Sequence, residues 1–70
     1  MLTPYERVIK AIGSTGRVAR LCNVTRSAVQ QWSRNGIPRD HILMLEQATQ
    51  GSEYPVTARE MLEWGVQLKA

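Results

Sequence analysis

The stretch "TGRVARLCNVTRSAVQQWSRN", residues 15–35, decides the fold because it predicts two short helices separated by a sharp turn. Ser14 and Thr25 precede the two helical segments, and both residue types favour the N-cap position of a helix. Asn23 stands between the segments, and asparagine tolerates the left-handed backbone conformation that a tight turn needs. Gly36 follows the second segment and is expected to end it.

The second segment divides into two faces when its residues are placed on a helical wheel. Ala28, Val29 and Trp32 lie on one apolar arc, which we expect to face the protein. The opposite arc is wholly polar, and its members are Ser27, Gln30, Gln31 and Arg34. A solvated face more often carries glutamate and lysine at i, i+4 spacing, whereas serine, glutamine and arginine can hydrogen-bond to the edges of DNA bases. The polar arc is therefore a candidate for binding nucleic acid.

The rest of the chain has dense helix punctuation and only weak strand signals. Thr3 and Pro4 favour the start of a first helix, which Gly13 is expected to end. The sequence "TARE", residues 57–60, has the capping-box pattern of a last helix, and Gly65 is expected to stop that helix. The predicted helices span residues 4–12, 15–22, 25–35, 39–49 and 57–64.

Apolar positions at helical spacing predict one shared core. The expected inward side chains are Val8, Ile9, Ile12, Val18, Ala19, either Leu21 or Cys22, Ile42, Leu43 and Leu45, with Met44 and Ala48 as further candidates. The fold class is then all-α, a compact bundle of four to five short helices in a single domain over residues 1–70. The tail "VQLKA", residues 66–70, is either frayed or paired with a partner.

The net charge of +3 is unevenly distributed along the chain. Residues 1–39 carry +6, because seven basic residues and no acid lie between Glu6 and Asp40, whereas residues 40–70 carry −3. A basic half of this kind attracts a polyanion, and nucleic acid is the commonest candidate. A basic face that serves only solubility is the alternative interpretation.

Several other classes of protein have no support in the sequence. Cys22 is the only cysteine, so no intramolecular disulfide can form, and we expect it to be a small core residue. No apolar run approaches the roughly 18 residues needed to cross a bilayer, and the N-terminus lacks a signal-peptide pattern. The chain shows no nucleophile–base pair, no metal-ligand spacing and no glycine-rich phosphate loop. We therefore expect no enzyme activity, no cofactor, no metal, no membrane contact and no small-molecule ligand.

Two short helices, a turn of about four residues and a basic surrounding describe a helix-turn-helix, whose second helix enters the major groove of DNA. Ala19 is small where the two helices must approach closely, and Val24 follows the turn as an apolar plug. Asn23 departs from the glycine that usually fills the turn position. The helix-turn-helix unit is predicted over about residues 15–35.

The segment "VARLCNVTRSAVQQWSRNGIPRDHILMLEQATQG" resembles the small Cro-type repressors of lambdoid phages and the related YdaS-like regulators of bacterial prophages. The likeness is clearest in its "AVxxWxxxGIP" core and in "LEQATQG", covers about residues 12–51, and weakens over "REMLEWGVQLKA". It implies a lambda-repressor-like domain that binds operator DNA and represses transcription in the cytoplasm of a bacterial host, at the nucleoid. Because one small domain reads few base pairs, we expect a homodimer, at least on DNA, and a pseudo-palindromic operator in double-stranded DNA.

The resemblance also implies roles for individual residues. The base-reading positions fall on Arg26, Ser27, Gln30 and Gln31. Arginine suits guanine and glutamine suits adenine, because each can form paired hydrogen bonds with that base. Candidates for contact with the DNA backbone are Thr15, Arg17, Arg20, Arg34 and Arg39. Beyond the segment that carries the resemblance, the possible dimer contacts are Leu62, Trp64 and Val66.

Some of these residues have competing interpretations. Arg20 could pair instead with an acid of the C-terminal half, and we expect Arg7 and Lys10 to be solvated. His41 is expected at or near the surface rather than as a ligand, and Trp32 in the core with Val29. Trp64 has two possible roles, which are packing within the domain and anchoring an interface.

Two other functions are compatible with the sequence. A helical protein-interaction module would usually expose apolar anchors at i, i+3, i+4 and i+7, and the polar arc of residues 25–35 has none. An antitoxin-like protein or an activator of a prophage would share DNA binding but differ in its biological effect. The sequence does not separate a repressor from these.

Overall fold

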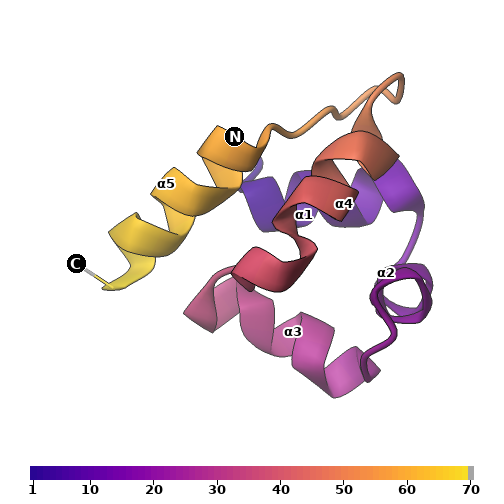
Figure 1. Ribbon diagram of the computed structural model, residues 1–70, viewed down its shortest axis with the longest axis horizontal. Helices are drawn as coiled ribbons and strands as arrows, with labels where there is room; N and C mark the ends of the chain where they lie inside the picture. Colours follow the sequence, from indigo (N-terminus) through magenta and orange to yellow (C-terminus); the bar gives the residue numbers. More distant parts are fainter. Residues whose placement is uncertain (70) are drawn as a thin grey trace.

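The computed structural model describes residues 1–69, which form five α-helices and no strand. The helices are α1 (Pro4–Ile12), α2 (Thr15–Cys22), α3 (Arg26–Asn35), α4 (Arg39–Thr49) and α5 (Ala58–Lys69). In Figure 1, α4 crosses in front of α1, with α2 at one side of the molecule, α5 at the other and α3 below. The predicted all-α bundle is confirmed. No helix within residues 1–69 is both long enough and apolar enough to span a membrane.

Polar side chains start the first three helices where the sequence predicts. Thr3 Oγ1 accepts a hydrogen bond from the Glu6 N–H at 3.1 Å, and the Thr3 N–H donates to Glu6 Oε1 at 3.0 Å. Ser14 and Thr25 each accept one from the N–H three residues later, both at 3.1 Å. These bonds satisfy backbone donors that a helix leaves unpaired in its first turn.

The turn between α2 and α3 has the geometry that its sequence predicts. Asn23 adopts the left-handed conformation, with φ 57° and ψ 46°. The Val24 N–H donates to the Ala19 carbonyl at 2.9 Å, which closes the turn. Val24 is half-buried and packs against the core as the expected apolar plug. The two helices are thereby locked together as a unit.

Buried side chains come from all five helices and from the connections that follow α3 and α4. They are Val8, Val18, Ala19, Cys22, Val29, Trp32, Ile37, Ile42, Leu45, Val56 and Met61. Most of the expected inward positions are confirmed, including Cys22 in place of Leu21, which is exposed. The core thus lies between α4 and the other helices, and it fixes the orientation of α3.

The prediction that Leu43 faces the core is wrong, because this side chain is 68% exposed. Ala48, a further candidate, is exposed as well. α4 buries Ile42, Leu45 and Thr49, which are spaced i, i+3 and i+7 and form one stripe. Leu43 and Ala48 lie off that stripe, so neither can reach the core.

The connection from α4 to α5 is held by a series of hydrogen bonds. Thr49 Oγ1 accepts from the Val56 N–H at 3.1 Å and donates to the Glu46 carbonyl at 3.1 Å. Glu46 Oε2 in turn accepts from the Ala58 N–H at 2.8 Å, at the start of α5. The capping box predicted in residues 57–60 is confirmed, with reciprocal bonds of 3.2 and 3.1 Å.

The expectation that Gly65 stops the last helix is wrong, because α5 continues to Lys69. Gly65 lies inside the helix where α5 crosses the end of α3, and a Cβ placed on Gly36 would lie 3.1 Å from Gly65 Cα. The two backbones therefore approach closely at a pair of glycines. Residues 66–69 of the tail are helical rather than frayed, and Ala70 lies outside the described residues.

Two contacts join α1 to α5 and correct the prediction that Arg7 is solvated. The Arg7 guanidinium donates to the Glu60 carboxylate and to the Pro55 carbonyl. Tyr5 stacks on Trp64, with ring centroids 6.4 Å apart and an angle of 20° between the planes. Lys10 is exposed, as expected.

Candidate nucleic-acid interface

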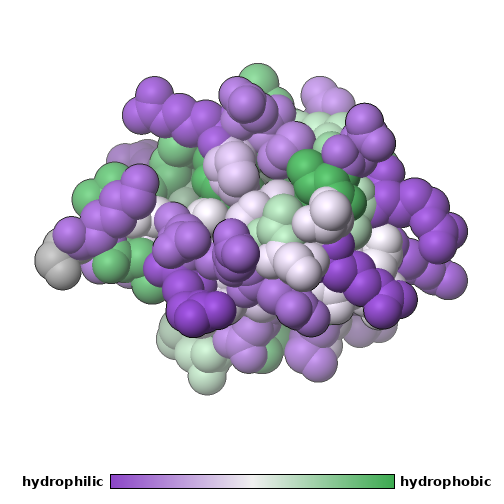
Figure 2. Space-filling view, turned by 90° about the horizontal axis from the view of Figure 1, so that it is seen from below, coloured by the Kyte–Doolittle hydropathy of each residue, from purple (hydrophilic) through white to green (hydrophobic). Residues whose placement is uncertain are grey.

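α3 presents its polar arc to solvent. The exposed residues on it are Arg26, Ser27, Gln30, Gln31 and Arg34. On the opposite arc Val29 and Trp32 are 0% and 5% exposed, so the predicted division of the helix is confirmed. Figure 2, which views the molecule from the side that carries α3, shows mostly hydrophilic atoms over this face. Neither α2 nor α3 contains an acidic residue, so the face can approach an anion without repulsion.

The Arg26 side chain folds back across the first turn of α2. A Cβ placed on Gly16 would lie 3.1 Å from Arg26 Nη2 and 3.2 Å from Nε, so the guanidinium rests against the glycine backbone. The Arg26 guanidinium therefore lies close to the N-termini of both α2 and α3. Helix N-termini carry partial positive charge, so this corner of the molecule favours an anion.

Arg17 and Thr15 lie on different sides of the start of α2. Arg17 is exposed and its side chain folds over Gly13, where a Cβ would lie 3.1 Å from Arg17 Nη1. Thr15 is half-buried and lines a shallow hollow with Tyr5 and Ile9 of α1. A phosphate at this helix start would thus meet backbone N–H groups and Arg17 more readily than the Thr15 hydroxyl.

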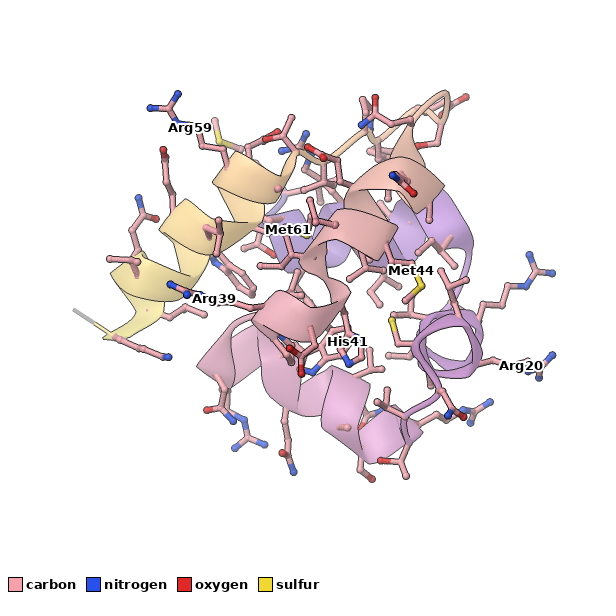
Figure 3. The ribbon with its side chains drawn as sticks, in the orientation of Figure 1. Arg20, Arg39, His41, Met44, Arg59 and Met61 are labelled. Carbon is pink, nitrogen blue, oxygen red and sulfur yellow. The ribbon has the colours of Figure 1, made fainter. Side chains whose placement is uncertain are left out.

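Arg20 points away from the body of the domain in Figure 3, on the side opposite α5. The ion pairs within residues 1–69 are Arg7–Glu60 and Arg59–Glu63, so Arg20 has no acidic partner in this part of the chain. The alternative pairing with a C-terminal acid is not observed. Arg20 remains an exposed cation beside the helix-turn-helix.

Arg39 lies where α4 begins, beside the C-terminal end of α3. It lines a shallow cleft together with Gln31 and Asn35 of α3 and with Lys69 of α5. This cleft brings a predicted base-reading side chain and two cations together. Lys69 is thus an additional basic residue at the edge of the α3 face.

Sequence reasoning missed Lys69 because it ended the last helix at Gly65. The signal that could have found it is the apolar spacing of Met61, Trp64 and Leu68, at i, i+3 and i+7, which continues past the glycine. In the structure Met61 is fully buried and Trp64 half-buried, and Leu68 lies near Gly36. That stripe directs α5 along the end of α3.

The three predicted dimer residues do not lie together. Leu62 and Val66 are exposed and line one hollow, whereas Trp64 is half-buried and stacked on Tyr5. Trp64 therefore packs within the domain, which is one of the two roles that its sequence left open. Leu62 and Val66, together with Leu68, are the exposed large apolar side chains of α5 within the described residues.

His41 and Cys22 both pack against other side chains of the domain. His41 is half-buried and stacks on Trp32, with ring centroids 5.7 Å apart, which supports the anchoring side of α3. Burial raises the pKa of the Cys22 thiol, as expected for a core position. No three His, Cys, Asp or Glu side chains within residues 1–69 come close enough to bind a metal ion.

Comparison with known proteins places the chain in a family. No curated protein and no solved structure matches it. Residues 5–63 match the model of a family described as bacterial toxin YdaS. The match spans α1 to α4, including the complete helix-turn-helix, and the first half of α5. The chain therefore belongs to the YdaS family of small, prophage-associated proteins with a helix-turn-helix-like fold.

Proposed function

We propose that this protein is a sequence-specific regulator of transcription that binds double-stranded DNA by placing α3 in the major groove. The observation that carries the proposal is the exposed, acid-free polar arc of α3, backed by the buried Val29 and Trp32. A helix held rigidly on one face and polar on the other suits insertion into the groove. We place the protein in the cytoplasm of its bacterial host, at the nucleoid.

Base reading is assigned to residues near the start and middle of α3. Arg26, Ser27, Gln30 and Gln31 are exposed and can reach base edges from a helix in the groove. Gln30 and Gln31 can donate and accept at once, which matches the paired groups of adenine. Arg26 can use its two parallel N–H donors on guanine.

Backbone contacts are assigned to the cations that surround α3. Five cations lie around the base-reading residues: Arg17 and Arg20 on α2, Arg34 on α3, and Arg39 and Lys69 beyond the end of α3. Such groups bind phosphates and fix the register of the protein without reading sequence. Their affinity falls with salt because binding releases counterions from the DNA.

The description of the family as a bacterial toxin raises a second question, about biological effect. A regulator that occupies host promoters through α3 would be toxic when overproduced, whether its normal role is repression or activation. Growth of a bacterial host that overproduces the chain separates the cases. If toxicity works through DNA, Gln30→Ala with Gln31→Ala relieves it, whereas a toxic effect that survives this pair of changes is exerted elsewhere.

Selection of bound sequences from a random duplex pool tests the proposed function. We expect enrichment of a short motif that appears twice in inverted orientation. A pool that stays random after repeated rounds, under salt conditions where the protein still binds, contradicts sequence-specific recognition.

A further inference from the structure

The last turn of α5 lies against the end of α3. A Cβ placed on Gly36 would lie 3.1 Å from Gly65 Cα and 3.9 Å from Leu68 Cδ1, so the backbone of α5 passes close to the residue that follows α3. Gly36 is itself buried. Because Lys69 comes directly after Leu68, this approach places the final residue of α5 beside the end of the predicted recognition helix.

Two neighbouring hollows adjoin this approach. One opens on the α3 face beside Gln31, and the other reaches α5 beside Leu62 and Val66. Three polar side chains line both hollows, and each comes from a different helix: Asn35 of α3, Arg39 of α4 and Lys69 of α5. In Figure 3, Arg39 extends from the start of α4 toward α5. Three helices thus bring one polar side chain each to the same place.

The three side chains offer positive charge and hydrogen-bond donors without a neighbouring acid. Arg39 and Lys69 are exposed cations, and the exposed Asn35 amide adds an N–H donor group. Within residues 1–69 no acidic side chain lines either hollow, and neither cation takes part in an ion pair. Asp40 follows Arg39 in the chain but is absent from both linings. The arrangement therefore favours an anion.

A phosphate of the DNA backbone is the anion that this place can receive. The hollow beside Gln31 measures about 460 Å³, whereas one water molecule takes up about 30 Å³ in the liquid, so a phosphate group has room to enter. Gln31 is proposed to read a base from the major groove, and phosphates run along both edges of that groove. A phosphate beside the base that Gln31 contacts would therefore lie near this hollow.

We propose that Asn35, Arg39 and Lys69 bind the same phosphate of the DNA backbone, so that the last turn of α5 belongs to the DNA-binding surface. We call these three residues the phosphate clamp. The inference rests on the proposed function and deepens it, because it assigns three helices to a single point of contact. The family match ends at residue 63, so Lys69 adds to the interface from outside the matched segment.

A purely structural role is the competing explanation for the two cations. Positive side chains near the C-terminal end of a helix interact favourably with the helix dipole, and both Arg39 and Lys69 lie near such an end. In that case Arg39→Ala and Lys69→Ala would lower the melting temperature and leave the contacts with DNA unchanged. The phosphate clamp predicts the reverse, with little change in melting temperature and a loss confined to one phosphate.

Neutralising one DNA phosphate at a time tests the clamp. In a methylphosphonate a methyl group replaces one charged oxygen, and this change is made at each position of the selected duplex in turn. We expect one position in each half-site at which the unmodified protein loses affinity and at which Asn35→Ala, Arg39→Ala and Lys69→Ala each show a loss at least about threefold smaller. Arg20→Ala is the matched control, because Arg20 lies on the side opposite α5 in Figure 3, and it should keep the full loss at that position.

The outcomes separate the clamp from the proposed function. If no position affects the unmodified protein, its register on DNA is not fixed, and both proposals fail. If some positions matter but none of them depends on Lys69, or if the three clamp variants respond at different positions, the clamp alone is overturned.

The close approach at Gly36 provides a second test in which every clamp side chain is kept. Gly36→Ala should displace α5 from α3, so the loss at the clamp position should fall to that of Lys69→Ala, and adding Lys69→Ala should change nothing more. Gly65→Ala is the matched control, because its Cβ meets nothing within 4 Å, and it should keep the full loss. A folded Gly36→Ala variant that keeps the full loss overturns the positioning of Lys69 by Gly36. If this variant does not fold, the three side-chain variants decide.

Discussion

The guanidinium of Arg26 rests on the backbone of Gly16, at a point where any Cβ would lie about 3.1 Å from Arg26 Nη2. This contact joins the start of the predicted recognition helix to the start of the helix before it. Because glycine has no side chain, Arg26 can lie close to the α2 N-terminus. Arg26, the one arginine among the four predicted base-reading residues, thus lies against a residue of another helix.

Gly16→Ala should therefore change DNA recognition without unfolding the domain. The added methyl group displaces the far end of a flexible side chain, and alanine favours helix over glycine by about 0.5–1 kcal/mol. We expect an unchanged or higher melting temperature and weaker binding to the selected duplex. The check is a double-mutant cycle with Arg26→Ala in fluorescence anisotropy. If Gly16 acts through Arg26, the double variant binds no worse than Arg26→Ala alone, and fully additive losses would refute the link.

Gly36 and Gly65 should respond in opposite ways to alanine. Gly36 has φ 89°, and its added Cβ would meet Gly65 Cα at 3.1 Å, whereas a Cβ on Gly65 meets nothing within 4 Å. We expect Gly36→Ala to lower the free energy of unfolding by about 1–3 kcal/mol. Gly65→Ala should raise it by about 0.5–1 kcal/mol, because it removes a helix-interior glycine. Urea denaturation measures both, and a destabilised Gly65→Ala would contradict the open space beside this position.

Glu60 should make stability depend on pH in the acid range. The hydrogen bond from Arg7 holds the pKa of Glu60 below its usual value, with a smaller contribution from the bonds of Thr57. The stabilisation is fully present above the unfolded-state pKa of about 4.3 and is lost as the pH falls through the lower folded-state pKa. Glu60→Gln keeps a side chain that suits the capping box but removes the charge.

For Glu60→Gln we expect a loss of less than about 1 kcal/mol at neutral pH, since the pair is partly exposed. The difference from the unmodified chain should disappear below the folded-state pKa. Thermal melts across the acid range measure it. A constant difference at all pH values would show that packing, and not the charge pair, is responsible.

Lys69 and Arg17 should strengthen binding to all DNA alike. Each is placed to meet a phosphate, so Lys69→Ala and Arg17→Ala should each reduce the slope of log affinity against log salt by about 1. Arg59→Ala is the matched control, because Arg59 points away from the domain at the far end of α5 in Figure 3. Equal slopes for Lys69→Ala and Arg59→Ala would remove Lys69 from the interface.

Local signals in the sequence predicted most of the fold. Thr3, Ser14 and Thr25 are caps whose hydrogen bonds depend on nearby backbone, and Asn23 accepts a left-handed conformation by itself. Such features are encoded within four residues of chain. The division of α3 into a buried and an exposed arc likewise follows from the helical spacing of the apolar residues within α3.

The errors came from contacts between segments far apart in the chain. The low helix propensity of glycine predicted that the last helix ends at Gly65. Packing against Gly36 and the apolar stripe on α5 instead stabilise the helix beyond this residue. Arg7 binds Glu60, 53 residues away, and no local pattern could indicate that partner. The exposure of Leu43 likewise depends on which face of α4 the other helices cover. The site residues on α3 were accessible to sequence reasoning, whereas Lys69 was not.

Gln30 and Gln31 are proposed to read bases from α3, and competition binding measures this most directly. Fluorescence anisotropy compares the affinity for the selected duplex with that for a random duplex of equal length. Each good base contact discriminates by about 1–3 kcal/mol, so Gln30→Ala or Gln31→Ala should reduce this ratio about 5- to 150-fold, with random-duplex affinity unchanged. Equal losses on both duplexes, or an unchanged ratio for both variants, would contradict recognition by this face of α3.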